Sequence, residues 1–145
     1  MTDTEASTIR VLLVEDHTVF RQALALAFGM EPELEVVGQA GSVAEAREML
    51  DGIDVAVFDL DLPDGNGASL IQELHDRNRR AEALVLTAST RQIDHARAVE
   101  AGAAGLVHKS TPLNEIVDAV KRFAAGETLI TRRELIELVQ LAGKH

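Results

Sequence analysis

Several residue types are absent from this chain of 145 residues or are rare in it. It has no cysteine, tryptophan or tyrosine, and only four phenylalanines and three prolines. The absence of cysteine excludes a disulfide framework and a thiolate metal site. The scarcity of aromatic rings argues against a surface on which nucleic-acid bases would stack.

Long hydrophobic runs are also missing. No apolar stretch approaches the roughly 18 residues needed to cross a bilayer, so no membrane partner is expected. The N-terminus is polar and acidic, unlike a secretory signal peptide, and predicts a disordered tail over residues 1–8. A cytoplasmic protein is the simplest expectation.

Positive charge is scarce as well. Lysine and arginine total 14 against 24 aspartates and glutamates, which gives a formal net charge of −10. Direct binding to nucleic acid is therefore disfavoured, because affinity for the phosphate backbone comes mainly from lysine and arginine. Most of the acidic residues are interpreted as solvated surface, and a smaller group as a cluster that a cation neutralises.

Apolar runs typical of strands alternate with segments of helical periodicity along most of the chain. Strands are predicted at 9–14, 36–38, 54–58, 83–87 and 106–108, and helices at 18–30, 42–50, 67–77, 92–101 and 112–125. This alternation predicts βαβ units with right-handed crossovers and a parallel sheet that is covered on both faces. The expected fold class is α/β, a flavodoxin-like doubly wound five-stranded parallel sheet in the order 2-1-3-4-5.

Two capping boxes mark helix starts. Ser42-Val43-Ala44-Glu45 opens the second helix, and Thr131-Arg132-Arg133-Glu134 predicts an extra C-terminal helix. That last helix either packs back on the domain or forms a linker or dimerisation helix that leads to a further domain. The chain is accordingly divided into the tail 1–8, one domain over 9–125, and a linker with the C-terminal helix over 126–145.

Four of the predicted strands end in polar side chains. Glu15 and Asp16 follow the first strand, Asp59 follows the third, Thr87 ends the fourth and Lys109 follows the fifth. Parallel strands present their carboxyl ends at one edge, where ligands bind in open sheets of this type. Carboxylates held together repel one another unless a cation is present, and Mg²⁺ is the hard ion that prefers oxygen ligands.

The same group of side chains suits phosphoryl transfer. A carboxylate at a strand end, Asp59, is placed as the nucleophile. Mg²⁺, the ammonium of Lys109 and the hydroxyl of Thr87 would position the phosphoryl oxygens and neutralise their charge. The sequence therefore predicts a site that receives a phosphoryl group.

Four motifs in order resemble those of a response-regulator receiver domain of two-component signalling, over roughly Ile9 to Ala125. They are Leu-Val-Glu15-Asp16, Phe-Asp59-Leu-Asp-Leu-Pro63-Asp-Gly-Asn-Gly67, Leu-Thr87-Ala-Ser and Val-His-Lys109-Ser. The segment Lys109-Ser-Thr-Pro-Leu-Asn-Glu115, followed by Ile-Val-Asp-Ala-Val, resembles the subgroup that carries a C-terminal helix-turn-helix output domain.

The resemblance implies a role for each matching residue. Asp59 would be the phosphoacceptor that attacks a phosphohistidine on a partner sensor histidine kinase. Asp16 would bind Mg²⁺ directly, Glu15 through water, and Asp59 together with the backbone carbonyl of Asp61 would complete the metal ligands. Asp61 and Ser89 occupy positions where the family tunes autodephosphorylation.

The resemblance also implies a signalling switch rather than an enzyme. Thr87 would hydrogen-bond the phosphoryl group and shift as the switch, and Lys109 would pair with the phosphoryl oxygens. The face formed by the fourth helix, fifth strand and fifth helix would respond. The expected consequences are homodimerisation on phosphorylation and DNA binding only through an output domain beyond His145.

Two positions depart from the family pattern. The family often has an aromatic residue in the fifth strand as a partner of the switch threonine, where this chain has Leu106. The family lysine is also frequently followed by proline across a cis bond. Here Ser110 follows, and a cis bond before a non-proline residue costs about 2.5–4 kcal/mol.

The five histidines, at positions 17, 75, 95, 108 and 145, do not pair with one another at metal-ligand spacing and are interpreted as surface residues. His17 follows the acidic pair directly and could lie near the site.

Two alternatives use the same residues differently. Asp59-Leu60-Asp61 also matches the Asp-x-Asp signature of haloacid-dehalogenase-like phosphatases, in which Asp61 would be a general acid. Against this, the nucleophile lies on the third strand, and Glu115 and Asp118 fall inside a helix instead of ending a strand. The second alternative is a pseudo-receiver, an interaction module that signals without phosphate.

Overall fold

The protein was analysed as a computed structural model that describes residues 8–88, 91–127 and 140. Five parallel strands form the main sheet in the order β2-β1-β3-β6-β7, and two short strands form a separate antiparallel hairpin. The strands are β1 (Ile9–Val14), β2 (Leu34–Ala40), β3 (Val55–Asp59), β4 (Asp61–Leu62), β5 (Gly65–Asn66), β6 (Glu82–Thr87) and β7 (Gly105–His108). Because β4 and β5 belong to the hairpin, the sheet confirms the predicted order 2-1-3-4-5.

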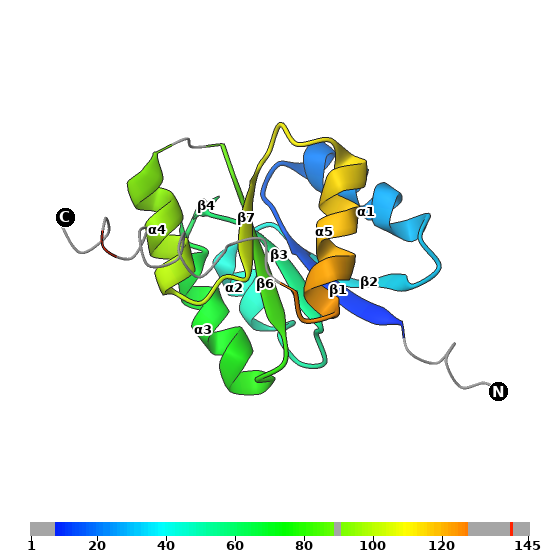
Figure 1. Cartoon of the computed structure of the whole chain (residues 1–145), viewed down its shortest axis with the longest axis horizontal. Helices are drawn as coiled ribbons and strands as arrows, with labels where there is room; N and C mark the ends of the chain where they lie inside the picture. Colours follow the sequence, from blue (N-terminus) through cyan, green and yellow to red (C-terminus); the bar gives the residue numbers. More distant parts are fainter. Residues whose placement is uncertain (1–7, 89–90, 128–139, 141–145) are drawn as a thin grey trace.

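Helices cover both faces of the sheet (Figure 1). The helices are α1 (Thr18–Gly29), α2 (Val43–Arg47), α3 (Ala68–Arg77), α4 (Gln92–Glu100) and α5 (Leu113–Ala124). α1 and α5 pack on one face, whereas α2, α3 and α4 pack on the other. The predicted C-terminal helix and its capping box at 131–134 lie outside the described residues.

Alternating side chains of β1 divide the hydrophobic core in two. Leu12 and Val14 belong to the cluster beneath α2, α3 and α4, and Val11 and Leu13 to the cluster beneath α1 and α5. All four are fully buried, because strand side chains point alternately to opposite faces and both faces are covered here. This two-sided burial explains why the strands appear in the sequence as continuous apolar runs.

α5 is held against the sheet by one apolar stripe. Ile116, Val120 and Phe123 are fully buried, at the spacing that places side chains on one side of a helix. A Cβ added to Gly105 would lie 2.5 Å from Cζ of Phe123, so the glycine allows this ring to sit directly on β7.

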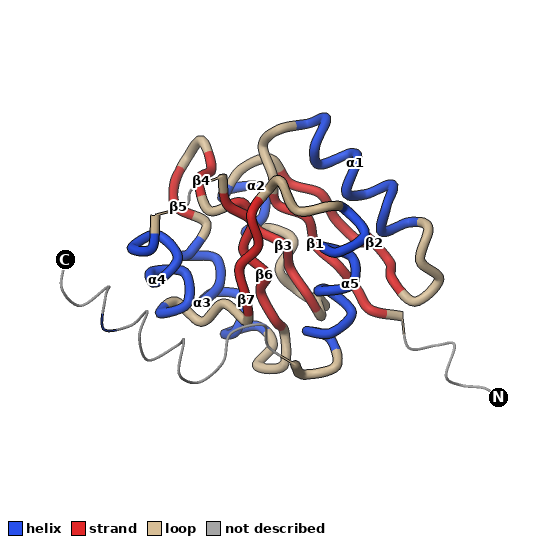
Figure 2. Tube along the Cα trace, turned by 45° about the horizontal axis from the view of Figure 1, so that its top comes forward, coloured by secondary structure: helices blue, strands red, loops and turns tan. Residues whose placement is uncertain are grey.

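Three local features differ from the prediction. β2 spans Leu34–Ala40 and extends beyond the predicted 36–38 at both ends. α2 ends at Arg47, short of the predicted Leu50, and the chain turns back through Gly52 at φ +73°. The β4–β5 hairpin was not predicted and follows directly on β3 (Figure 2).

Hydrogen bonds fasten this hairpin to the start of α2. The carboxylate of Asp64 accepts from the backbone N–H of Val43 at 2.8 Å and of Ala44 at 3.0 Å. The predicted capping box is present as well, with the Ser42 hydroxyl accepting from the N–H of Glu45 at 3.1 Å. The segment that follows β3 is thereby anchored on α2.

Among the described residues, no helix combines the length and apolar composition needed to span a bilayer.

Candidate functional site

Strand register brings the predicted site residues to one edge of the sheet. Val14 pairs with Phe58, so that Glu15, which follows, lies next to the end of β3 at Asp59. On the other side Thr87 pairs with His108, immediately before Lys109. The carboxyl ends of β1, β3, β6 and β7 therefore meet, as the sequence predicts for parallel strands.

Lys109 bridges two buried carboxylates. Its Nζ lies 2.8 Å from Oδ2 of Asp59 and 2.9 Å from Oε1 of Glu15. Glu15 and Asp59 are only 1% and 3% exposed. At such burial the ion pairs are screened little by solvent, and each carboxylate depends on the ammonium as its counter-charge.

Burial also decides how these groups titrate. Loss of hydration raises the pKa of Asp59 from 3.8 to about 6, and the charge of Glu15 adds to this increase, against the hydrogen bonds from Lys109 and Asp61. Burial alone would raise the pKa of Glu15 too. There, hydrogen bonds from the backbone N–H of His17 and from Lys109 prevail and lower it. Of the two acids, Asp59 is thus the one that takes up a proton more readily.

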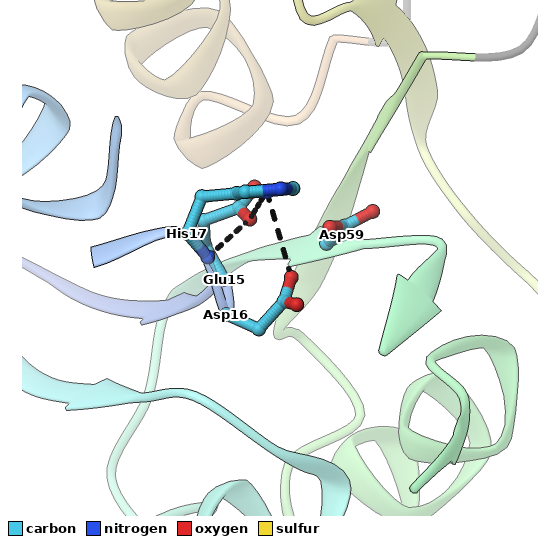
Figure 3. Close-up of side chains that lie close together, drawn as sticks. All are labelled: Glu15, Asp16, His17 and Asp59. Atoms are coloured by element: carbon cyan, nitrogen blue, oxygen red, sulfur yellow. Dashed lines mark hydrogen bonds and ion pairs between the residues drawn. The ribbon is translucent and has the colours of Figure 1, made fainter. Parts of the chain in front are cut away.

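Four side chains form a candidate metal centre. Glu15, Asp16, His17 and Asp59 each offer one ligand atom, and these atoms lie within 4.8 Å of one another (Figure 3). Glu15 Oε1 is buried and pairs with the Lys109 ammonium at 2.9 Å. Three carboxylates facing a single ammonium leave excess negative charge, which fits a divalent cation with a preference for oxygen.

Asp61 contributes to this site through its backbone. Its N–H donates to Oδ1 of Asp59 at 3.0 Å, while its own carboxylate is exposed and does not belong to the four-residue cluster. This hydrogen bond holds Oδ1 of Asp59 in place, while Oδ2 accepts a hydrogen bond from the ammonium of Lys109.

The two predicted switch residues lie on neighbouring strands. Thr87 is 1% exposed at the end of β6, and its carbonyl accepts from the N–H of Lys109 at 2.9 Å. Leu106 is half-buried on β7 opposite Val85 and packs against the core beneath α2, α3 and α4. The Lys109–Ser110 peptide is trans, since none of the described peptide bonds is cis.

Several contacts at the site were not predicted. The His17 ring lies 2.9 Å from Oε2 of Glu15, and Arg21 donates to the Glu15 carbonyl at 2.7 Å. The position of His17 directly after the acidic pair predicts that it lies near the site, and the spacing of His17 and Arg21, one helical turn apart, is the sequence signal for the Arg21 contact. His108 reaches the carbonyl of Ala88 through Nε2 at 3.1 Å; no sequence signal marked it.

Gly67 is required for steric reasons. A Cβ at this position would lie 2.5 Å from the carbonyl oxygen of Asp59, closer than any real contact. The last glycine of the motif around Asp59 is therefore explained by close approach of two backbone segments.

Comparisons with known proteins agree with this geometry. The family model for the response regulator receiver domain matches residues 11–121. The chain is 42% identical over 133 residues to the DNA-binding transcriptional activator DevR/DosR of Mycobacterium tuberculosis, covering 90% of this chain and 61% of that protein. It is 27% identical to the nitrate/nitrite response regulator NarL of Escherichia coli K12, with the same coverage. The chain thus spans about three fifths of the length of these relatives.

Solved structures show the same fold. The receiver domain of the putative response regulator NarL of Mycobacterium tuberculosis superposes with a TM-score of 0.77 at 30% identity, covering 83% of this chain and 99% of that one. A LuxR-family response regulator of Aurantimonas sp. SI85-9A1 gives 0.79 at 28% identity, with coverage of 93% and 98%. With its sheet order, its strand-end site and this family match, the chain belongs to the response-regulator receiver domain family.

Proposed function

We propose that this domain is a phosphorylation-controlled switch that accepts a phosphoryl group on Asp59 from a sensor histidine kinase. The observation that carries the proposal is the placement of Asp59, a buried carboxylate at a strand end, 2.8 Å from Lys109 and beside two further acids. With a pKa of about 6, Asp59 is mostly ionised at neutral pH and so carries the negative charge that makes its oxygen nucleophilic.

In the proposed step, an oxygen of Asp59 attacks phosphorus while the bond from phosphorus to the kinase histidine breaks. The electron pair of that bond returns to the imidazole, and an acyl phosphate remains on Asp59. Lys109 neutralises charge on the phosphoryl oxygens, and the Thr87 hydroxyl donates to one of them. Tethering by the Asp61 N–H limits rotation of the Asp59 carboxylate.

Mg²⁺ is the cofactor that we assign to the acidic cluster. Glu15, Asp16 and Asp59 would hold it together with the backbone carbonyl of Asp61. Bound there, it would supply charge neutralisation for the phosphoryl oxygens.

Output would follow from the switch residues. A phosphoryl group on Asp59 adds negative charge that draws Thr87 and Lys109 toward it. Thr87 ends β6 and Lys109 follows β7, and these strands lie next to α4 and α5. Leu106 would transmit the shift by packing instead of by an aromatic ring. The relative DevR/DosR is a DNA-binding transcriptional activator, which supports an output on DNA through a further domain, with homodimerisation on phosphorylation.

The decisive experiment is labelling with acetyl phosphate and Mg²⁺, read by intact mass. The wild type should gain one phosphoryl group, and Asp59→Asn should gain none. Equal labelling of the asparagine variant would refute the assignment. The matched control is Asp61→Asn, which should still be labelled; its loss of chemistry would favour a phosphatase of the Asp-x-Asp type.

A phosphate-independent interaction module is tested separately. NMR titration with Mg²⁺ and beryllofluoride, a mimic of the phosphoryl group, should shift the resonances of Thr87 and β7. Unchanged resonances on this face would favour the pseudo-receiver.

A further inference from the structure

The side chain of His108 has no role in the proposed function, although it links two loops of the site. His108 ends β7, where it pairs with Thr87 of β6. Nε2 of its ring lies 3.1 Å from the carbonyl oxygen of Ala88, and Nδ1 lies 2.7 Å from Oγ of Ser110. The ring therefore connects the residue after Thr87 with the residue after Lys109.

The partners of the ring determine its tautomer. The Ala88 carbonyl oxygen can only accept, so Nε2 carries the proton. The backbone N–H of Ser110 can only donate and lies 3.1 Å from Nδ1, so Nδ1 is bare and the Ser110 hydroxyl donates to it as well. A neutral imidazole with its proton on Nε2 thus satisfies all three contacts.

The ring extends the pairing of β6 and β7 by one residue. The backbone N–H of Lys109 donates to the Thr87 carbonyl at 2.9 Å, beyond the last strand pair. At the next carbonyl along the chain, that of Ala88, the imidazole N–H takes the place of a backbone donor. The peptide that follows Thr87 is therefore held on the side of β6 that faces β7.

This side lies opposite to the phosphoacceptor. β6 stands between β3 and β7, with Leu86 paired to Asp59 on one side and Thr87 paired to His108 on the other. A shift of Thr87 toward a phosphoryl group on Asp59 would draw the Ala88 carbonyl away from the ring. A displacement of roughly 0.5 Å would be enough to break a hydrogen bond of this length.

We propose that His108 is a positioning residue that restrains Thr87 in the unphosphorylated domain, and that switching breaks its hydrogen bond to Ala88. The inference rests on the proposed function, because it concerns regulation of the same site. Loss of the restraint should favour the phosphorylated conformation. A variant without this hydrogen bond should therefore bind a phosphoryl mimic more tightly, by about fivefold for one neutral hydrogen bond.

The test is calorimetric titration of beryllofluoride, in the presence of Mg²⁺, into wild type, His108→Asn and His108→Gln. The amide nitrogen of glutamine can reach the Ala88 carbonyl in place of Nε2, whereas the shorter asparagine cannot. His108→Asn should bind the mimic about fivefold more tightly than wild type, and His108→Gln should remain close to wild type. Ser110→Ala, which loses the hydroxyl that orients the ring, should shift the affinity in the same direction by a smaller factor.

The matched control is His75→Asn in the last turn of α3, where the imidazole lies next to Gly102. Its affinity should equal that of wild type. In addition, ¹⁵N NMR of the wild-type His108 ring should show the proton on Nε2 before the mimic is added.

Equal or weaker binding of the mimic by His108→Asn would overturn the inference, and so would a proton on Nδ1. Weaker binding in both His108 variants would mean that the ring only stabilises the loops. If wild type binds the mimic and is labelled by acetyl phosphate, such results count against the restraint alone. If wild type does neither, the proposed function fails and the inference fails with it.

Discussion

Asp59 holds a negative charge in a nearly dry environment, and asparagine would remove the charge while keeping the shape of the side chain. The rise of its pKa from 3.8 to about 6 measures how strongly folding disfavours the charged form. At 1.36 kcal/mol for each pKa unit, this amounts to about 3 kcal/mol at neutral pH. In the variant, Lys109 keeps its ion pair with Glu15 but loses the one with Asp59. The loss of that ion pair offsets part of the gain in stability. We expect metal-free Asp59→Asn to be more stable than wild type by about 1–3 kcal/mol.

The pH dependence has a definite sign. Because the pKa of Asp59 is higher in the folded state, the folded protein binds the proton more tightly than the unfolded chain does. Stability that this group contributes therefore declines as pH rises from 3.8 to about 6, and is constant above that range. The difference in unfolding free energy between Asp59→Asn and wild type should accordingly shrink as pH falls from about 6 to 3.8, and vanish below 3.8.

Urea denaturation of both proteins in chelator, across this pH range, provides the measurement. The control is Asp61→Asn, whose carboxylate is exposed and should change stability by no more than about 0.5 kcal/mol. Mg²⁺ at ten times its Kd should stabilise the wild type by about 1.4 kcal/mol and the Asp59 variant by much less. The prediction is contradicted if Asp59→Asn is less stable than wild type at neutral pH, or if its stability advantage grows on acidification.

Three further predictions concern neighbouring positions. Lys109→Met should cost about 3 kcal/mol in urea denaturation without metal, because Glu15 and Asp59 lose their shared counter-charge, and added Mg²⁺ should restore part of that loss. Gly67→Ala should cost about 1–3 kcal/mol in thermal denaturation and slow acetyl phosphate labelling, since its Cβ would meet the Asp59 carbonyl at 2.5 Å. The pKa of Asp64 is lowered by the backbone N–H groups at the start of α2, so the stability it contributes is present above its unfolded pKa and lost on acidification. NMR titration should show the low pKa, and Asp64→Ala should lose protection of those amides.

The sheet and most of the site were predictable from local pattern. Each buried strand is an apolar run with a polar end, and parallel pairing alone then brings Asp59 and Lys109 together, although they are 50 residues apart. The β4–β5 hairpin was not predictable, because two-residue strands have no periodicity. The early end of α2 and the contacts that the His17 ring makes with Glu15 and Lys109 depend on tertiary packing, which the sequence pattern does not indicate, although the position of His17 after the acidic pair did place it near the site.

The instability assigned to Asp59 and the affinity proposed for a cation have one physical source. Three carboxylates lie together, and the one ammonium beside them pairs with Glu15 and Asp59, so the folded domain carries uncompensated negative charge at the carboxyl edge of its sheet. Burial of the Asp59 charge, to which the repulsion adds, lowers the stability of the metal-free protein, and a bound cation offsets both effects. A variant that relieves the repulsion by removing a carboxylate must therefore also weaken the binding of the cation. Stability without metal and affinity for metal should consequently change in opposite directions along a series of substitutions that remove the charge of Asp59.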